Sequence, residues 1–366
     1  MKLLMIGYGM VGHKFIESVL EHADDALEIT ILAEEPRIAY DRVHLTDYFN
    51  GKTAKDLSLA RADFADAYGI DLRLNCKATA IDCANKTVST EDGARFDYDK
   101  LVIATGSYAF VPPIQGNDRD NCFVYRTIED LDAIRAASMT AKSGVVIGGG
   151  LLGLEAAKAL SDLKLETHVV EFAPRLMAVQ IDDLGAKVLR TKIEALGVQV
   201  HTQKQTQSIQ AGDNSVHRLK CADGFELETD LILFSAGIRP RDELARFSGL
   251  KIGERGGIVI NDQCQSSDAD IYAIGECALW DNKIYGLVAP GYEMARVAAQ
   301  HLFEKNKTGF AGADMSTKLK LMGVDVASIG DAHAMTAGAL SYFYADEAAM
   351  IYKKIVVNAE KTQLLG

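Results

Sequence analysis

Apolar and polar positions near the start of the chain follow two different periods. Residues 2–6 form a short apolar run, residues 11–22 have apolar positions three or four apart, and residues 27–32 form a β-branched run that ends before Glu34 and Glu35. A short apolar run is typical of a buried strand, and the longer spacing is typical of a surface helix. Because a glycine-rich turn joins the first two segments, residues 1–35 predict one βαβ unit.

The same order of elements recurs after Pro112 and Pro113. The predicted elements are a strand over residues 144–147, a glycine turn over 148–153, a helix to about residue 163 and a strand over 166–170. Residues 101–106 close the first unit with a strand and a glycine, and residues 230–237 close the second unit in the same way. The spacing is too wide for a solenoid and indicates that one supersecondary unit is duplicated.

Shorter segments complete the pattern. The ranges 70–80, 86–90 and 94–98 predict short strands, with a hairpin turn over residues 91–93. Residues 270–276 lead into a helix predicted over residues 293–304. The last segment, residues 316–366, alternates in strands that include 351–357, and a turn over 358–361 precedes Leu364 and Leu365. We expect the chain to stop in the return strand of a hairpin.

Composition and charge narrow the function classes. With 366 residues, 48% of them hydrophobic and only 6 prolines, the chain has enough apolar material for two or more packed domains, which excludes disorder. The net charge of −12, without a Lys or Arg block longer than a pair, argues against a nucleic-acid partner. The start does not resemble a signal peptide, and no apolar window reaches about 18 residues. We therefore expect a soluble cytoplasmic protein without a membrane partner.

The cysteines are thinly spread, at Cys76, Cys83, Cys122, Cys221, Cys264 and Cys277. Without a C-x-x-C pair or a histidine cluster, neighbouring residues assemble neither a zinc site nor an iron–sulphur site. We expect no metal in this chain and buried or incidental thiols. A dithiol between distant cysteines stays open.

The first glycine motif, residues 7–12, has the residue types that a nucleotide pyrophosphate needs. Gly7 permits a tight turn, Gly9 removes a side chain that would block the phosphate, Gly12 lets helix and strand pack, and the amide of Met10 faces the anion. In a chain with 31 glycines, one such motif is weak support and a structural turn is the alternative. The flanking strand and helix, and Glu34 as an acceptor for ribose hydroxyls, favour a dinucleotide site.

The second glycine motif, residues 148–153, meets the same tests, with Glu171 after the following strand. Two dinucleotide sites in one chain imply two different dinucleotides that exchange electrons. An acidic residue at this strand end accepts a free 2′-hydroxyl and repels a 2′-phosphate, so NADH is favoured over NADPH. Arg175 stands close by and weakens this preference, although it also reads as a solvated loop charge.

Five motifs together resemble the pyridine-nucleotide-disulfide oxidoreductase class, whose members carry FAD on the first unit and NAD(P)H on the second. These motifs are residues 7–12, 104–107, 148–153, 235–240 and 271–276. Within that class, four further segments resemble the FAD/NAD(P)H reductase portion of assimilatory nitrite reductase large subunits: residues 36–45, 275–277, 286–292 and 317–328. The electron-transfer subunits of assimilatory nitrate reductase are nearly as similar.

The resemblance implies an α/β fold with two Rossmann-like domains and a partial α+β C-terminal interface domain. The implied limits are residues 1–112 with 253–310 for the FAD-binding domain, 113–252 for the NAD(P)-binding domain and 311–366 for the interface domain. The residues it places on FAD are Gly7, Gly9, Met10, Gly12, Glu34, Arg42, Ala78, Thr105, Gly106, Gly275 and Glu276. Those it places on NAD are Gly148, Gly150, Leu151, Leu152, Gly153, Glu171 and Gly237. Glu276 stands where the class usually has an Asp that binds the ribityl hydroxyls.

Two departures from the class bear on mechanism. Its disulfide members have a cysteine pair early in the first unit, whereas no cysteine precedes Cys76 here, so thiol-based catalysis is not expected. Its ferredoxin-reductase-like members pair a Lys with the Glu of the second glycine helix, but this chain has Asp47 at the lysine position beside Glu155. Two like charges would compete unless one is protonated or points away. Glu155 and His44 are weak catalytic candidates. The alternative for Glu155 is a role in helix packing, and the alternative for His44 is an ordinary loop histidine. The catalytic residues stay unknown.

The mechanism implied by the resemblance needs no side-chain nucleophile. NADH would pass hydride to FAD while the protein supplies position and excludes water. Single electrons would then reach an iron–sulphur or sirohaem acceptor, which must lie on a partner or on downstream sequence, because this chain lacks the cysteine clusters for it. The primary hypothesis is the electron-input module of a nitrite or nitrate assimilation enzyme. The alternatives are a stand-alone ferredoxin or rubredoxin reductase, a nitrate reductase electron-transfer subunit, and a redox-sensing or assembly protein; a homodimer stays open.

Overall fold

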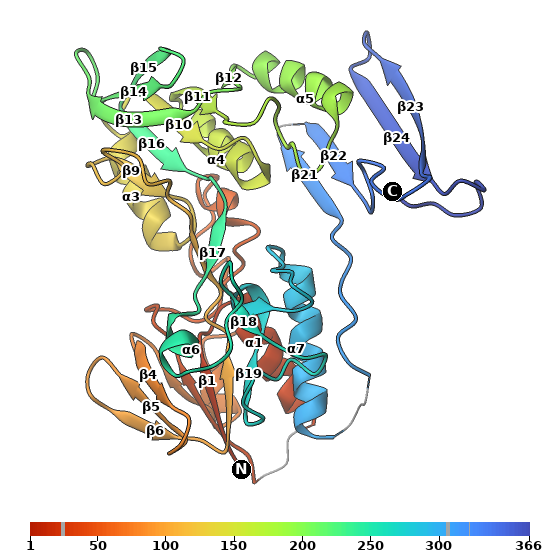
Figure 1. Ribbon diagram of the computed structural model, residues 1–366. Coiled ribbons are helices and arrows are strands. Elements are labelled where there is room, and N and C mark those ends of the chain that lie inside the picture. Colours follow the sequence, from red (N-terminus) through yellow and green to blue (C-terminus); the bar gives the residue numbers. More distant parts are fainter. Residues whose placement is uncertain (23–25, 305–307, 322) are drawn as a thin grey trace. The chain divides into compact units, whose positions relative to one another are not determined.

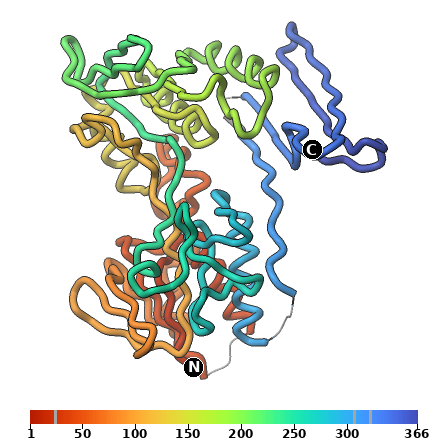
Figure 2. The backbone as a smooth tube through the Cα atoms, in the orientation of Figure 1, coloured from red at the N-terminus to blue at the C-terminus, as the bar shows by residue number. Residues whose placement is uncertain are grey.

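The computed structural model describes residues 1–22, 26–304, 308–321 and 323–366 (Figure 1). The chain forms two compact units, and each unit combines segments that are far apart in sequence, as the colours in Figure 2 show. The first unit consists of Met1–Val43, Thr53–Tyr108 and Ile238–Asp314, and the second of His44–Lys52, Ala109–Gly237 and Met315–Gly366. The limits of the nucleotide-binding domains stay predictions. Met322, part of the predicted 317–328 motif, lies outside the described residues.

A five-stranded parallel sheet forms the centre of the first unit, in the order β19-β7-β1-β2-β3. Its strands are β1 (Lys2–Ile6), β2 (Glu28–Leu32), β3 (Asp71–Arg73), β7 (Lys100–Ile103) and β19 (Ile271–Ala273). Helices α1 (Met10–Leu20) and α7 (Val288–Leu302) pack against each other beside this sheet. The βαβ unit predicted for the first residues is confirmed, because β1 pairs in parallel with β2.

Smaller elements complete the first unit. Strands β4 (Ala78–Asp82), β5 (Thr87–Thr90) and β6 (Arg95–Asp97) form an antiparallel sheet, which confirms the predicted hairpin. Its turn contains Gly93 at φ +85°, a conformation that glycine adopts without steric cost. The remaining short elements are α2 (Phe64–Ala67), β8 (Ser107–Ala109), β17 (Ile238–Pro240), α6 (Glu243–Phe247), β18 (Ile258–Val259), the 3₁₀ turn η2 (Gly275–Cys277) and β20 (Ala278–Leu279).

The second unit repeats the plan with a parallel sheet in the order β12-β11-β10-β16-β9. Its strands are β9 (Cys122–Val124), β10 (Ser143–Ile147), β11 (Glu166–Val170), β12 (Gln199–His201) and β16 (Leu231–Phe234). Its helices are α3 (Ile128–Ser138), α4 (Leu151–Asp162) and α5 (Asp183–Ala195), together with the 3₁₀ turn η1 (Leu45–Tyr48). An antiparallel sheet follows, with strands β13 (Thr206–Ala211), β14 (His217–Cys221) and β15 (Glu226–Thr229). The predicted duplication is therefore confirmed at the level of strand, glycine turn, helix and strand.

One helix boundary was predicted wrongly. Helix α7 begins at Val288, before the predicted start at Glu293, and ends at Leu302. The reason is Pro290, which lies in the first turn of the helix, where backbone amides have no partner within the helix and a proline is tolerated.

The C-terminal part of the second unit consists of two antiparallel hairpins. They are formed by β21 (Thr317–Leu321) with β22 (Val324–Ser328) and by β23 (Leu340–Asp346) with β24 (Ile351–Val357). Leu364 bridges Val357, as expected for a return strand. The described residues after Met315 contain no helix, so they show only the β part of the predicted α+β domain.

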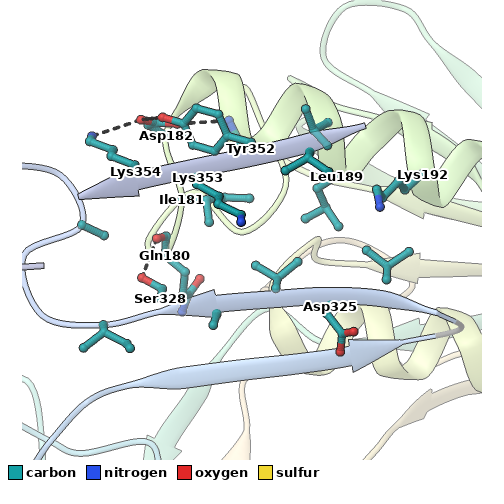
Figure 3. A pocket seen from close by; sticks show the side chains of 18 of the residues that line it. Gln180, Ile181, Asp182, Leu189, Lys192, Asp325, Ser328, Tyr352, Lys353 and Lys354 are labelled. Carbon is teal, nitrogen blue, oxygen red and sulfur yellow. Dashed lines mark hydrogen bonds and ion pairs between the residues drawn. The ribbon is translucent and has the colours of Figure 1, made fainter. Parts of the chain in front are cut away.

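A cavity of about 470 Å³ lies between α5 and these hairpins (Figure 3). Asp182 joins the two sides, because its carboxylate accepts hydrogen bonds from the Tyr352 hydroxyl at 2.6 Å and from Lys354 Nζ at 3.0 Å. Gln180 joins β22 as well, through its carbonyl and the Ser328 hydroxyl at 2.7 Å. These bonds attach the C-terminal hairpins to the start of α5.

Candidate functional site

Most of the residues predicted to bind FAD lie at one edge of the first sheet. In a parallel sheet all strands end at the same edge, which is where ligands bind in open α/β folds. The segments that follow four strands contribute residues here: 7–10 after β1, 34 after β2, 105–106 after β7 and 275–276 after β19. Segments far apart in sequence therefore meet at this edge.

The glycines of the first motif have separate steric roles. Gly7 has φ +97°, and a Cβ there would overlap the carbonyl of Ala104. A Cβ on Gly12 would lie 2.6 Å from the carbonyl oxygen of Gly7. At Gly9, by contrast, a Cβ would meet no atom within 4 Å. Gly9 is also the N-cap of α1 and makes no side-chain cap, so open space adjoins the uncapped amides of the helix.

The second motif reproduces this geometry in the second unit. Gly148 has φ +118°, and a Cβ there would overlap the carbonyl of Ser235, while a Cβ on Gly153 would overlap the carbonyl of Gly148. Gly150, the N-cap of α4, again has open space where its Cβ would be and makes no side-chain cap. Leu151 and Leu152 form the first turn of α4. Gly237, at φ +109°, also faces open space.

We call these two arrangements the first and the second cradle: residues 7–12 with Glu34, and residues 148–153 with Glu171. In both cradles, the N-cap glycine, Gly9 or Gly150, has open space where a side chain would lie. This space adjoins the uncapped amides at the start of the helix. A pyrophosphate needs this combination of close backbone approach and amide donors. The residues present therefore fit a dinucleotide in each cradle.

In the first cradle, Glu34 is held by two cationic side chains that sequence reasoning missed. Arg241 donates to its Oε2 at 2.8 Å, and Lys77 Nζ lies 3.4 Å from its Oε1. The sequence carried no local signal for these pairs, because Arg241 follows Glu34 by more than half the chain.

Arg42 lies in the same unit but its partner is Glu35. The Arg42 guanidinium donates to Glu35, which also accepts from the Tyr40 hydroxyl at 2.8 Å. The backbone amide of Arg42 donates to the Met10 sulfur at 3.4 Å, so Met10 and Arg42 lie together as predicted for one site. The sequence did offer one signal for this pair: two acidic residues, Glu34 and Glu35, follow β2, and one of them could pair with a nearby cation.

The other predicted FAD residues are also fixed by hydrogen bonds. Ser107 donates its hydroxyl hydrogen to Glu276 at 2.7 Å, and the Thr105 hydroxyl donates to the carbonyl of Arg241 at 2.7 Å. The carbonyl of Gly106 accepts from the amide of Arg241 at 3.0 Å. Gly275, at φ +78°, packs its Cα side against Val11 of α1. Ala78 is buried at the start of β4, next to a register shift in that strand.

In the second cradle, Glu171 is held by backbone amides. Its Oε2 accepts from Gly149, inside the glycine motif, and its Oε1 accepts from Ala173 at 2.6 Å. The amide of Met177 donates to the carbonyl of Gly149 at 2.9 Å, which draws the following loop onto the motif. Arg175 points to another partner, since its Nη1 lies 2.8 Å from Asp183 and its Nε donates to the carbonyl of Ile181.

Glu155 is a half-buried carboxyl group on α4, which packs against η1. Burial raises its pKa to about 7, and the nearby His44 opposes that rise. Asp47, the other acid of the predicted competition, forms an ion pair with Lys52 at 2.7 Å. Burial also raises the pKa of Tyr125, whose hydroxyl donates to Thr46 at 3.0 Å.

All six cysteines lie in the described ranges, and none is in a disulfide. Burial raises the pKa of each thiol, which disfavours the nucleophilic thiolate. Among the described residues, no group of three or more His, Cys, Asp or Glu could hold a metal ion. The helices within those ranges are too short or too polar to cross a membrane.

The sequence matches the pyridine nucleotide-disulphide oxidoreductase family over residues 1–301, and the chain belongs to this family. It is an NAD(P)H-dependent flavin oxidoreductase related to nitrite reductase large subunits, as the motifs predicted.

Two curated relatives place it more closely. The NADH nitrite reductase large subunit of Escherichia coli (strain K12) is 55% identical over 367 residues, which cover 100% of this chain and 43% of that protein. The assimilatory nitrate reductase electron transfer subunit of Bacillus subtilis (strain 168) is 36% identical over 361 residues, or 98% of this chain and 46% of that protein. The chain thus spans less than half the length of either relative.

A solved structure agrees with the fold. The NAD-dependent persulfide reductase from A. fulgidus has a TM-score of 0.87 and 27% sequence identity, covering 100% of this chain and 73% of that one. The predicted α/β fold is confirmed.

Proposed function

We propose that the chain is the electron-input module of a nitrite-reducing enzyme of nitrate assimilation: FAD occupies the first cradle and NADH enters the second. The observation that carries this proposal is the paired glycine geometry, in which Gly9 and Gly150 leave the same vacancy beside an uncapped helix. Two such vacancies in one chain suit one bound and one exchanging dinucleotide. The nitrite reductase name of the E. coli relative supports the pathway.

The chain's own residues bind and position the two nucleotides. When bound, FAD supplies a carrier that accepts hydride from NADH and gives electrons to a one-electron acceptor. The amides at the starts of α1 and α4 would donate to the pyrophosphates, and Glu34 and Glu171 would accept from ribose hydroxyls. Glu276, oriented by Ser107, would accept from the ribityl chain. Burial raises the pKa of Tyr125, so the Tyr125 hydroxyl stays protonated and can donate its hydrogen bond to Thr46.

Glu155 and His44 are the titratable pair that we propose to lie beside the reacting groups. With a pKa near 7, Glu155 can hold or release a proton in the neutral range. Asp47 pairs with Lys52, so a cation balances its negative charge.

The proposed nicotinamide donor is NADH. Glu171 presents a carboxylate to the ribose position, which repels a 2′-phosphate. Arg175, the cation that could offset this repulsion, is bonded to Asp183 and Ile181.

We place the final acceptor, an iron–sulphur or sirohaem centre, outside this chain, on a partner or a further domain. The relatives support this, since each is more than twice as long as the part that the chain matches. We further propose that the module works in the cytoplasm, where NADH is the reductant. A homodimer is one assembly that light scattering would detect.

The test combines the purified chain, FAD and NADH with a separately purified sirohaem-containing nitrite-reducing partner. We expect NADH to bleach the flavin band and nitrite to be consumed in proportion to NADH. The matched control is Gly150→Ala, which should keep FAD but lose electron entry.

Three results would overturn the proposal. The chain is no flavin reductase if NADH leaves the flavin band unchanged. It is a stand-alone rubredoxin or ferredoxin reductase if a generic rubredoxin accepts electrons as fast as the nitrite-reducing partner. Binding of both nucleotides with negligible transfer to an artificial one-electron acceptor would indicate a sensing or assembly role.

A further inference from the structure

We propose that Arg241 and Lys77 are positioning residues of the FAD site: they hold Glu34 for the adenosine ribose and give the Glu34 cluster one more cation than carboxylate. This inference rests on the proposed FAD site. It adds two cations that neither the glycine motif nor the family resemblance points to.

Arg241 is fixed at both its side chain and its backbone. The guanidinium Nη1 donates to Glu34 Oε2 at 2.8 Å. The backbone amide donates to the Gly106 carbonyl at 3.0 Å, and the backbone carbonyl accepts from the Thr105 hydroxyl at 2.7 Å. One residue therefore ties the end of β7 to the carboxylate after β2, across the position of β1 and its glycine motif in the sheet.

Lys77 reaches the same carboxylate from the segment after β3. Its Nζ lies 3.4 Å from Glu34 Oε1, so each carboxylate oxygen has one cationic neighbour. A carboxylate oxygen accepts more than one hydrogen bond, and lone pairs remain for ribose hydroxyls. The orientation of Glu34 is thus set before a ligand arrives, which lowers the ordering cost of binding.

The charges of this cluster do not cancel. Two cations surround one carboxylate, whereas Arg42 and Glu35 nearby form a balanced pair. This excess belongs to the Glu34 cluster alone, because the Glu276 carboxylate lies at the same edge of the sheet, where Gly9 leaves room for a pyrophosphate. A dianionic group placed there would gain from the excess charge as well as from the helix amides.

A surface ion pair without a role is the alternative explanation. The Arg241 and Glu34 side chains are 42% and 48% exposed, and such a pair alone is worth at most about fivefold in an equilibrium constant. The backbone bonds of Arg241 argue against that explanation, because they fix the main-chain position from which the side chain reaches Glu34, independently of the ion pair.

The test measures FAD affinity of the apoprotein by fluorescence quenching, in wild type, Arg241→Ala and Lys77→Ala. We expect Arg241→Ala to raise the FAD Kd about tenfold and Lys77→Ala about threefold, with Arg241→Lys between wild type and Arg241→Ala. Arg255→Ala is the matched control, since Arg255 is an exposed arginine of the same unit, and its FAD Kd should stay unchanged. The thermal unfolding temperature of each apo variant shows that the fold is kept.

A double-mutant cycle with Glu34→Gln separates positioning from independent binding. If Arg241 acts through Glu34, adding Arg241→Ala to Glu34→Gln costs less than Arg241→Ala costs alone. Strict additivity, or an unchanged Kd in Arg241→Ala, overturns the inference while the FAD site itself stands. A wild-type chain that binds no FAD overturns the proposed function and this inference together.

Discussion

The two cradles share their steric design and differ in their charges. Gly7 and Gly148 each avoid a carbonyl after a distant strand, Gly12 and Gly153 avoid the carbonyl of that first glycine, and Gly9 and Gly150 leave open space. Glu34 is held by two cations, however, whereas Glu171 is held by two backbone amides. Glycine geometry therefore leaves room for a dinucleotide in both cradles, and we propose that the surrounding charges set how firmly each nucleotide is bound. We assign the cationic cradle to the retained cofactor and the other to the exchanging one.

The helices after the two motifs differ at one matching position. Seven residues after the first glycine, α1 has Lys14 and α4 has Glu155. Both side chains are half-buried, but Lys14 pairs with Glu17 at 3.1 Å, whereas desolvation raises the pKa of Glu155 to about 7. The duplicated unit thus carries a carboxyl group only in its second copy at this position.

The largest effects are expected from the glycines that avoid carbonyls. Gly12→Ala and Gly153→Ala should each lower the free energy of unfolding by about 3 kcal/mol, because a Cβ would overlap a backbone oxygen that cannot move freely. Gly9→Ala and Gly150→Ala are the matched controls and should change stability by less than about 0.5 kcal/mol. Urea denaturation measures all four. Equal losses at all four positions would refute the separation of steric roles.

Glu155 should make stability depend on pH. Because folding raises its pKa from 4.5 to about 7, the folded chain retains a proton that the unfolded chain releases, and stability falls as pH rises through this window. Glu155→Gln removes that loss and should be more stable than wild type by about 3 kcal/mol at pH 8, with no difference below pH 4.5. Denaturation at several pH values measures this.

Lys14→Gln is the control at the matching position of α1. Its stability difference from wild type should not follow the same pH window. A Glu155→Gln difference that is constant with pH would contradict the raised pKa.

Much of this comparison was predictable from sequence, since strand, glycine and helix follow one another locally. The turn glycines and both βαβ units could be placed because periodicity and φ > 0 are local properties. The cationic partners of Glu34 could not be predicted, because Arg241 follows Glu34 only after two segments of the second unit, His44–Lys52 and Ala109–Gly237, in the chain. The start of α7 was missed because proline usually breaks a helix, and only the first turn tolerates it.

Glu171→Gln should weaken NADH binding more than it affects FAD. The amide nitrogen of Gln cannot accept from Gly149 or Ala173, so one of the bonds that hold the motif is lost. We expect the NADH Kd to rise about tenfold, with FAD content unchanged. Isothermal titration of the FAD-loaded chain measures the first, and its absorption spectrum measures the second. Loss of FAD with unchanged NADH affinity would reverse our assignment of the cradles.

The smallest effect is expected at Asp183. Asp183→Asn should release Arg175 for a 2′-phosphate and raise the NADPH to NADH ratio of kcat/KM up to about fivefold, because the ion pair is exposed. Arg175→Ala in the same background should cancel the gain. If the ratio does not move, Arg175 lies out of reach of the nicotinamide nucleotide.

The central claim is that each cradle serves a different dinucleotide. Anaerobic titration of flavin absorbance with NADH, in wild type, Gly9→Ala and Gly150→Ala, tests it most directly. We predict that Gly9→Ala is purified with little FAD but still binds NADH, and that Gly150→Ala keeps FAD and needs at least about tenfold more NADH to bleach it. The claim is contradicted if both variants lose the same nucleotide, or if neither differs from wild type.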